Sequence, residues 1–408
     1  MPARRFPVPP SARPAREAGF LAGFTLDTLI APSYRPNFLR DHWDRTPLVL
    51  NRRLRRFYTG LLTMDEVDQA MASGRGELSC VDARDGKGRT WLFTDGNPAR
   101  PATDALLSRV ADGATLIMDN AQRVLPGLGR MCRLLMSQTG HAWHCNLYAT
   151  PPGGQGFDGH VDDTGVFILQ VQGQKTWWFG NEQIARPLAG EGGRDAPDGW
   201  LDEAQQAVLA TGDMLYLPRG VPHAAAASDS SDEGSLHVTL TVSEASFADI
   251  AGVEAETLGD DDALRDLAPI GFHEDREGLA SALSERWTGD ATEAVEAFLM
   301  RQASRFQPEF KGRLASALKP KPVTDATETA PRDDLFWQIG APAGEEGVRA
   351  LVCGPVHLRF AERAEPALRA LLTIRTMVAD LPGALAETDR AALAGMLLDH
   401  ALINRRAG

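Results

Sequence analysis

Alternation of apolar and polar residues typical of strands is concentrated in the first 244 positions of this chain. The clearest case is residues 166–179, an apolar run broken by Gly173, which predicts two strands around a glycine turn. Residues 38–50 predict a helix that runs into a strand. Residues 64–71 and 122–136 predict helices. The pattern therefore predicts a strand-rich core with flanking helices.

The strand signals fade from residue 245 onward. Residues 279–306 carry apolar side chains at helical spacing, including Leu283, Trp287, Val295, Phe298 and Leu299. Residues 319–331 contain almost no large apolar residues and are typical of a linker. The segment after it predicts a helix, a pair of strands and further helices. Two apolar stripes mark these helices: Leu368, Leu371, Leu372 and Ile374, and then Leu393, Met396, Leu397 and Leu402.

The composition narrows the class of protein. A length of 408 residues predicts roughly two to four domains with a sizeable core. The net charge of -13 argues against general nucleic-acid binding and suits a basic partner protein. The four scattered cysteines predict reduced, buried thiols. No stretch is long and apolar enough to span a membrane, and the basic, proline-rich residues 1–19 lack the apolar core of a secretory signal, so we expect a cytoplasmic protein.

His160, Asp162 and His223 are the candidate metal ligands. Residues two apart on a strand project from the same face, so His160 and Asp162 can reach one ion. His223 follows a separate short apolar strand and would approach from there. Two imidazoles and one carboxylate on one side of a metal form the facial triad of non-haem Fe(II) oxygenases, which leaves positions open for a cosubstrate and dioxygen. A His-x-Asp pair also occurs by chance in surface turns, so its neighbours carry the interpretation.

Lys175 is the candidate cosubstrate ligand. It begins the second predicted strand of residues 166–179, and a small barrel would bring it near the triad. A single cation inside an apolar barrel is costly unless an anion pairs with it. The far carboxylate of 2-oxoglutarate would be such an anion, whereas the alternative is a solvated lysine at the end of a strand.

A series of ordered motifs resembles the JmjC-type ribosomal oxygenases, a cupin-related family of Fe(II)- and 2-oxoglutarate-dependent protein hydroxylases. The motifs are residues 146–157, His160 with Asp162, residues 167–170, 173–177, 212–220 and 237–241. Their order and spacing make the resemblance specific to this family. It implies that His160, Asp162 and His223 bind iron and that Lys175 binds the 5-carboxylate of 2-oxoglutarate.

The resemblance also implies an α+β fold and a domain order. We expect a double-stranded β-helix (cupin/JmjC) barrel with flanking helices over residues 20–244, after the tail of residues 1–19. A helical dimerisation domain would follow over residues 245–318, and the linker of residues 319–331 would lead to a winged-helix-like domain over residues 332–408. Arginine and acidic residues are near balance in this last domain, so we favour a protein-contact role over DNA binding.

Asn146, Tyr148 and Thr241 are the candidate substrate- and cosubstrate-contacting residues. The histidine-hydroxylating members carry an Asn-x-Tyr pair at this strand and a small hydroxyl residue at the position of Thr241, whereas the arginine-hydroxylating members differ at the strand. An amide and a phenol on one strand face can hydrogen-bond a polar side chain or the cosubstrate. The alternative is that they satisfy only backbone groups of the barrel. The chain departs from relatives at Gly165 and at the alanines 224–227. We expect both positions near the entrance for a peptide, so they bear on the identity of the substrate and not on the reaction.

The predicted function is therefore hydroxylation of a protein side chain, histidine or arginine of a ribosomal protein, by a homodimer using Fe(II), 2-oxoglutarate and dioxygen. Two alternatives stay open. One is a hydroxylase of another peptide or a natural product, and the other is an inactive metal-binding barrel that serves as a binding module.

Overall fold

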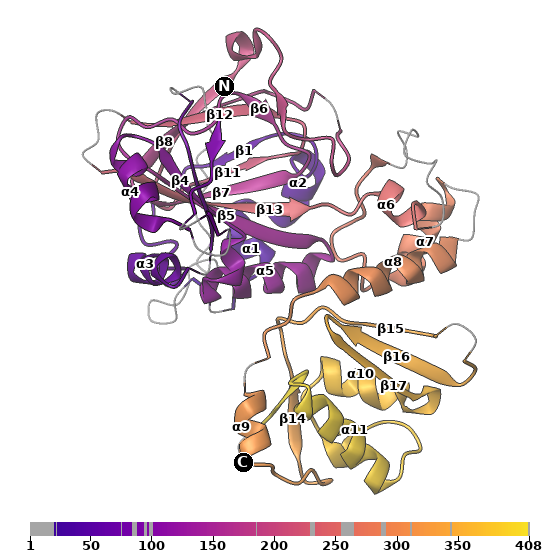
Figure 1. Cartoon of the computed structure of the whole chain (residues 1–408). Coiled ribbons are helices and arrows are strands. Elements are labelled where there is room, and N and C mark those ends of the chain that lie inside the picture. Colours follow the sequence, from indigo (N-terminus) through magenta and orange to yellow (C-terminus); the bar gives the residue numbers. More distant parts are fainter. Residues whose placement is uncertain are drawn as a thin grey trace. The chain divides into compact units, whose positions relative to one another are not determined.

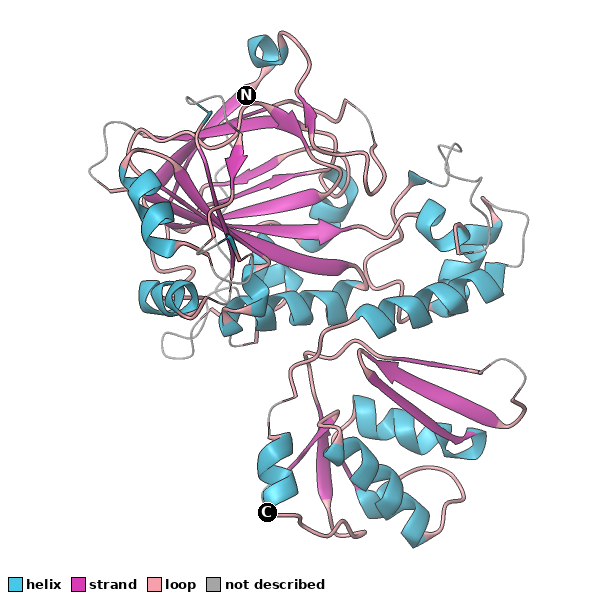
Figure 2. Cartoon of the chain, viewed as in Figure 1, coloured by secondary structure: helices cyan, strands magenta, loops and turns pink. Residues whose placement is uncertain are grey.

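Two antiparallel sheets frame the N-terminal part of the computed structural model (Figures 1 and 2). The model describes residues 20–406 except 22, 75, 84–87, 94–95, 98–100, 185, 229–232, 254–264, 287–290, 311 and 343–344. The larger sheet has the order β1 (Leu48–Leu50), β11 (Met214–Leu217), β7 (Gly165–Gln172), β13 (Ser235–Ser243), β5 (Ala142–Thr150), β4 (Thr115–Asp119), β2 (Glu77–Val81) and β3 (Arg89–Thr90). The smaller sheet has the order β10 (Gln205–Ala210), β8 (Gln174–Phe179), β12 (Pro222–Ala227), β6 (His160–Val161) and β9 (Arg194–Asp195).

Apolar side chains from both sheets meet in a buried core. One cluster joins β7 and β11 of the larger sheet to β8 and β10 of the smaller sheet, and it contains Val166, Ile168, Trp177, Phe179, Leu209, Leu215, Leu217 and Val221. Successive side chains of a strand point to opposite faces of the sheet. Every second residue therefore points into this core, and the residues between them lie on the other face. Burial of apolar area is the term that holds the two sheets face to face.

Gly173 separates the two strands that the sequence predicts over residues 166–179. Both strands are present, but they do not pair with each other: β7 lies in the larger sheet and β8 in the smaller one. Gly173 has φ +66°, and a Cβ at this position would lie 2.1 Å from the backbone oxygen of Gly234. Only glycine satisfies both restrictions, so this residue allows the chain to cross between sheets.

Helices pack around the larger sheet (Figure 1). They are α1 (Leu26–Ile30), α2 (Arg35–Asp41), α3 (Met64–Ala72), α4 (Thr103–Ala111) and α5 (Pro126–Thr139). A capping box between Thr63 and Glu66 begins α3, and Gly140, at φ 78°, ends α5. Both helices predicted from the sequence in this region are therefore present.

The chain divides into two compact units, residues 1–247 with 261–270 and residues 248–260 with 271–408. The second unit contains α7 (Arg276–Ser284), α8 (Ala291–Arg305), α9 (Arg313–Leu318), α10 (Glu365–Thr373) and α11 (Glu387–Asp399), and α6 (Phe247–Ala251) begins at its boundary. Its two small sheets have the orders β15 (Gln338–Gly340), β16 (Val348–Cys353), β17 (Val356–Ala361), and β18 (Thr376–Met377), β14 (Glu328–Pro331), β19 (Ile403–Arg405).

The structure corrects the predicted linker. Its last four residues form β14, which pairs with both β18 and β19. These residues carry little apolar area, so the local sequence gives no strand signal, and backbone pairing with partners far along the chain decides their conformation. Residues 1–19, the predicted tail, lie outside the described residues.

The large apolar residues of the predicted dimerisation domain, residues 245–318, are largely used within the chain itself. Phe247, Ile250, Phe298 and Phe306 are all buried, and Trp287 lies outside the described residues. These buried side chains are not available to a partner subunit, so they do not argue for a dimer, and the dimer stays a prediction.

Candidate functional site

Strand pairing brings the three predicted metal ligands together. His160 in β6 is the register partner of His223 in β12, and Asp162 directly follows β6. The Asp162 carboxylate lies 3.8 Å from His160 Nε2 and 3.6 Å from His223 Nε2. All three ligand atoms lie within 4.8 Å of one another. Within the part of the chain that the structure describes, this is the one cluster of histidine, cysteine and acidic residues with such geometry.

Backbone hydrogen bonds orient both imidazoles. His160 Nδ1 donates to the Asp158 carbonyl at 2.8 Å, and His223 Nδ1 donates to the Val221 carbonyl at 3.0 Å. With the proton on Nδ1, the lone pair of each Nε2 faces the Asp162 carboxylate. Burial, with a further contribution from His160, lowers the pKa of His223 to about 4, which keeps it neutral at physiological pH. Two imidazoles and one carboxylate, converging from one side, fit Fe(II) and leave its other positions open.

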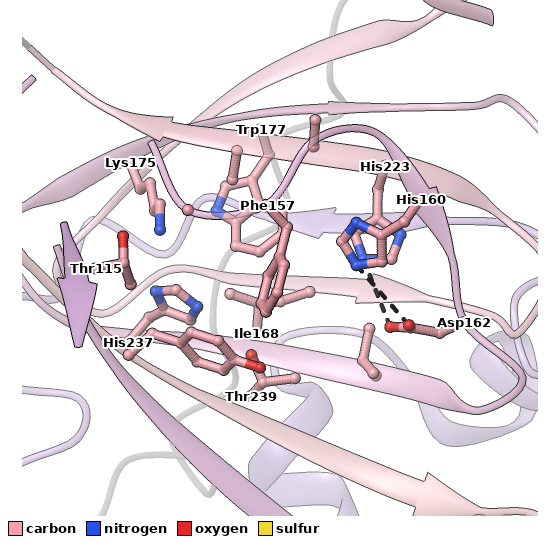
Figure 3. A pocket seen from close by; sticks show the side chains of 15 residues that line it. Thr115, Phe157, His160, Asp162, Ile168, Lys175, Trp177, His223, His237 and Thr239 are labelled. Atoms are coloured by element: carbon pink, nitrogen blue, oxygen red, sulfur yellow. Dashed lines mark ion pairs between the residues drawn. The ribbon is translucent and has the colours of Figure 1, made fainter. Parts of the chain in front are cut away.

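A cavity extends from this triad into the space between the sheets (Figure 3). The empty space in and around it, open solvent at its mouth included, is about 520 Å³. Its walls come from β4, β5, β7, β8, β12 and β13 and from the segment before β6. The side chains that line it include Thr115, Tyr148, Phe157, Ile168, Lys175, Trp177, His237 and Thr239, besides the triad.

Lys175 lies at the end of the cavity opposite the triad (Figure 3). Its side chain is buried, and Nζ donates to Thr150 Oγ1 at 3.0 Å. Thr150 Oγ1 in turn lies 3.0 Å from Thr115 Oγ1. No carboxylate of the described residues forms an ion pair with Lys175. Burial therefore lowers the pKa of its ammonium from 10.5 to about 7. An incoming carboxylate would supply the missing partner.

The three candidate contact residues differ in their placement. Tyr148 lines the cavity, and burial raises the pKa of its phenol, an effect that the nearby Asn146 side chain partly offsets. Asn146 is not among the residues that line the cavity, and its Oδ1 accepts from the Asn120 amide at 3.0 Å. Thr241 is buried on β13 but also lies outside the lining, where Thr239 takes the place we expected for it.

Trp177, Thr115, Phe157 and Thr239 also line the cavity, although the sequence predicts no separate role for them. His237 lines it as well, whereas beside a complete triad we expected this histidine to be structural. Period-two alternation links three of these residues to candidates from the sequence: Trp177 follows Lys175 by two positions, and Thr239 and His237 precede Thr241 by two and four. Thr115 and Phe157 reach the cavity only through the tertiary fold.

Comparison with known proteins identifies the domain that carries this site. Residues 118–250 match the family model of the JmjC domain. This part of the chain, which contains all three residues of the triad, is therefore similar to a JmjC domain. A bifunctional lysine-specific demethylase and histidyl-hydroxylase NO66 of Drosophila persimilis is 29% identical over 310 residues, which cover 72% of this chain and 42% of that protein. Ribosomal oxygenase 1 of Gallus gallus is 30% identical over 220 residues, covering 52% of this chain and 35% of that protein. The chain thus spans less than half the length of these relatives.

Solved structures agree on the fold. The crystal structure of Escherichia coli YcfD covers 92% of this chain and 98% of its own, with a TM-score of 0.51 at 17% identity. A structure of YcfD, described as a ribosomal oxygenase in complex with cobalt and 2-oxoglutarate, gives a TM-score of 0.50 at 18% identity, with 92% and 99% coverage. These matches, together with the JmjC family model, confirm the predicted JmjC/cupin fold. Among the described residues, no helix is long and apolar enough to cross a membrane.

Proposed function

We propose that this chain is an Fe(II)- and 2-oxoglutarate-dependent dioxygenase that hydroxylates a side chain of a protein. One observation carries the proposal. The cavity has the three-ligand cluster at one end and, at the other, the buried Lys175, which forms no ion pair with a carboxylate of the described residues. A dicarboxylate with a 2-oxo acid at one end suits both features. The histidyl-hydroxylase activity in the name of the Drosophila relative and the 2-oxoglutarate bound in the YcfD structure support this proposal.

The protein's own residues perform binding, orientation and exclusion of water. Bound iron would supply the oxidation, in which 2-oxoglutarate and dioxygen yield succinate, carbon dioxide and one hydroxyl oxygen on the substrate. His160 and His223 present Nε2 to the metal because their Nδ1 atoms are held by backbone carbonyls. Lys175, once protonated, holds the far carboxylate. Trp177 and other apolar residues of the wall, such as Ile168, keep water away from this end.

The substrate that we propose is a histidine, with arginine as the second candidate, in a ribosomal protein. The histidyl-hydroxylase activity in the names of relatives supports histidine. Tyr148 at the cavity wall offers a phenol to a polar side chain. The net charge of -13 favours a basic partner, and ribosomal proteins are basic. Such a substrate would place the enzyme in the cytoplasm.

Two measurements test this function. Purified protein loaded with Fe(II) should convert 2-oxoglutarate to succinate, and His223→Ala should not. Mass spectrometry of ribosomal proteins from cells with and without the gene should then show one peptide that gains a single oxygen in the gene's presence. Absence of succinate formation would contradict the enzyme class, whereas succinate without a modified ribosomal protein would favour another peptide or a natural product as substrate.

We further propose that the protein is a homodimer and that its C-terminal residues form a winged-helix-like unit for protein contact. Light scattering at micromolar concentration tests the first proposal, and a monomer would refute it. Binding of ribosomal proteins to the full chain, compared with a chain that ends before residue 332, tests the second.

A further inference from the structure

The end of the cavity near Lys175 contains polar atoms that the protein leaves unpaired. His237 Nδ1 and Trp177 Nε1 are both buried, and neither has a hydrogen-bond partner among the described residues. Buried polar atoms are almost always hydrogen-bonded, because leaving one unpaired costs free energy. Both side chains line the cavity, so the partner that they lack can come from a ligand.

Aromatic neighbours fix the orientation of the His237 ring. It stacks on Tyr148 with ring centroids 4.8 Å apart and planes 2° from parallel. It also meets Trp177 edge to face at 5.4 Å and 81°. Held between these two rings, the imidazole can turn little, and its nitrogens keep a fixed direction. Such a ring can position a ligand rather than adapt to it.

His237 lies near Lys175 and away from the metal ligands. Figure 3 shows the His237 imidazole at the Lys175 end of the cavity, with Thr115 beside it and the triad at the opposite end. Burial, reinforced by Lys175, lowers the pKa of His237 well below its ordinary value, so the ring is neutral and has one N–H to donate. The donors at this end are therefore the Lys175 ammonium and the His237 N–H, and Trp177 adds its indole N–H.

We propose that His237 is a positioning residue that donates a hydrogen bond to the carboxylate paired with Lys175, and that it thereby selects 2-oxo acids with a second carboxylate. The inference rests on the proposed function, since it assumes that 2-oxoglutarate occupies the cavity. A carboxylate accepts several hydrogen bonds at once, so an ammonium and a neutral imidazole can share it. A ligand whose far end is a methyl group would leave both donors unpaired.

Two substitutions separate the hydrogen bond from packing. His237→Phe keeps a ring on Tyr148 but removes both nitrogens, whereas His237→Gln loses the ring but keeps a donor. Binding of 2-oxoglutarate is measured by calorimetry without oxygen, with Mn(II) in place of iron, and 2-oxovalerate serves as the matched ligand that lacks the second carboxylate. We expect His237→Phe to weaken 2-oxoglutarate binding about tenfold, the value of one hydrogen bond to a charged group, and to leave 2-oxovalerate binding unchanged. His237→Gln should recover most of the loss.

Each outcome decides the question. If wild-type protein binds 2-oxoglutarate and His237→Phe binds it equally well, the role of His237 is refuted while the proposed function stands. Equal losses for both ligands would also refute it, because the effect would then not involve the far carboxylate. If the wild type binds no 2-oxoglutarate, both proposals fall. If His237→Phe does not fold, His237→Gln decides alone. It keeps a donor, so it should prefer 2-oxoglutarate to 2-oxovalerate as the wild type does, and loss of that preference would overturn the inference.

Discussion

Replacing Lys175 by methionine should stabilise the protein without its cosubstrate, because the native fold holds this ammonium in an unfavourable place. Burial lowers the pKa of Lys175 from 10.5 to about 7. At about 1.4 kcal/mol per pKa unit, the shift costs on the order of 4 kcal/mol of folding free energy at pH 7. Methionine has a similar length and no charge, so it removes this cost and fills the same space. Thr150 keeps its contact with Thr115 when the ammonium is gone.

The dependence on pH identifies the cause. Below pH 7 the lysine is charged in both the native and the unfolded state, so the full cost of burial is present. Between pH 7 and 10.5 the native lysine is neutral while the unfolded chain still binds the proton, so the cost falls as the pH rises. The gain from Lys175→Met should therefore shrink to about 2 kcal/mol at pH 9.

Urea denaturation of the wild type and the variant, followed by tryptophan fluorescence at pH 7 and pH 9, measures this gain. Lys321→Met is the matched control, since Lys321 is exposed and the same substitution there should change the free energy of unfolding very little. A Lys175→Met variant that is no more stable than the wild type at pH 7 would refute the reasoning. So would a gain that is equal at both pH values, because apolar packing rather than charge would then explain it.

Three other perturbations test two further features of the site and one buried ion pair elsewhere in the fold. His160→Ala and His223→Ala should each abolish Fe(II) binding in a metal titration, and unchanged affinity in both would remove the metal assignment. Binding of 2-oxoglutarate should weaken as the pH rises above about 7, by up to tenfold per pH unit, because a neutral Lys175 must first take up a proton. Calorimetry should show this pH dependence in the wild type and not in Lys175→Arg, whose cation stays charged. Asp44 and Arg219 form a buried ion pair in which Asp44 Oδ1 lies 2.9 Å from Arg219 Nε. Asp44→Asn should lower the free energy of unfolding, measured by urea denaturation, by about 3–5 kcal/mol. A loss below about 1 kcal/mol would mean that the pair contributes little to stability.

The sequence by itself indicated which groups carry the proposed chemistry. The spacing of His160 and Asp162 predicts that both side chains can reach one ion, and the structure brings them together although Asp162 directly follows β6 instead of lying in it. His223 and Lys175 were found because their flanking motifs resemble a family. Local patterns likewise predicted α3 and α5, since apolar periodicity and end signals such as Thr63, Glu66 and Gly140 are contained within a few residues.

Tertiary structure decided what surrounds that chemistry. The chain crossing at Gly173 moves β8 out of the sheet that holds β7 and into the smaller sheet, where it pairs with β12. In that register Lys175 lies opposite Ala227, four positions along β12 from His223, so the lysine and the metal ligands occupy opposite ends of one cavity. Only the pairing of β13 with β5 stacks His237 on Tyr148. Burial of Lys175, and hence its lowered pKa, arises from strands far apart along the chain. The local sequence specifies which groups are available, whereas desolvation and distance depend on long-range packing, which no local pattern encodes.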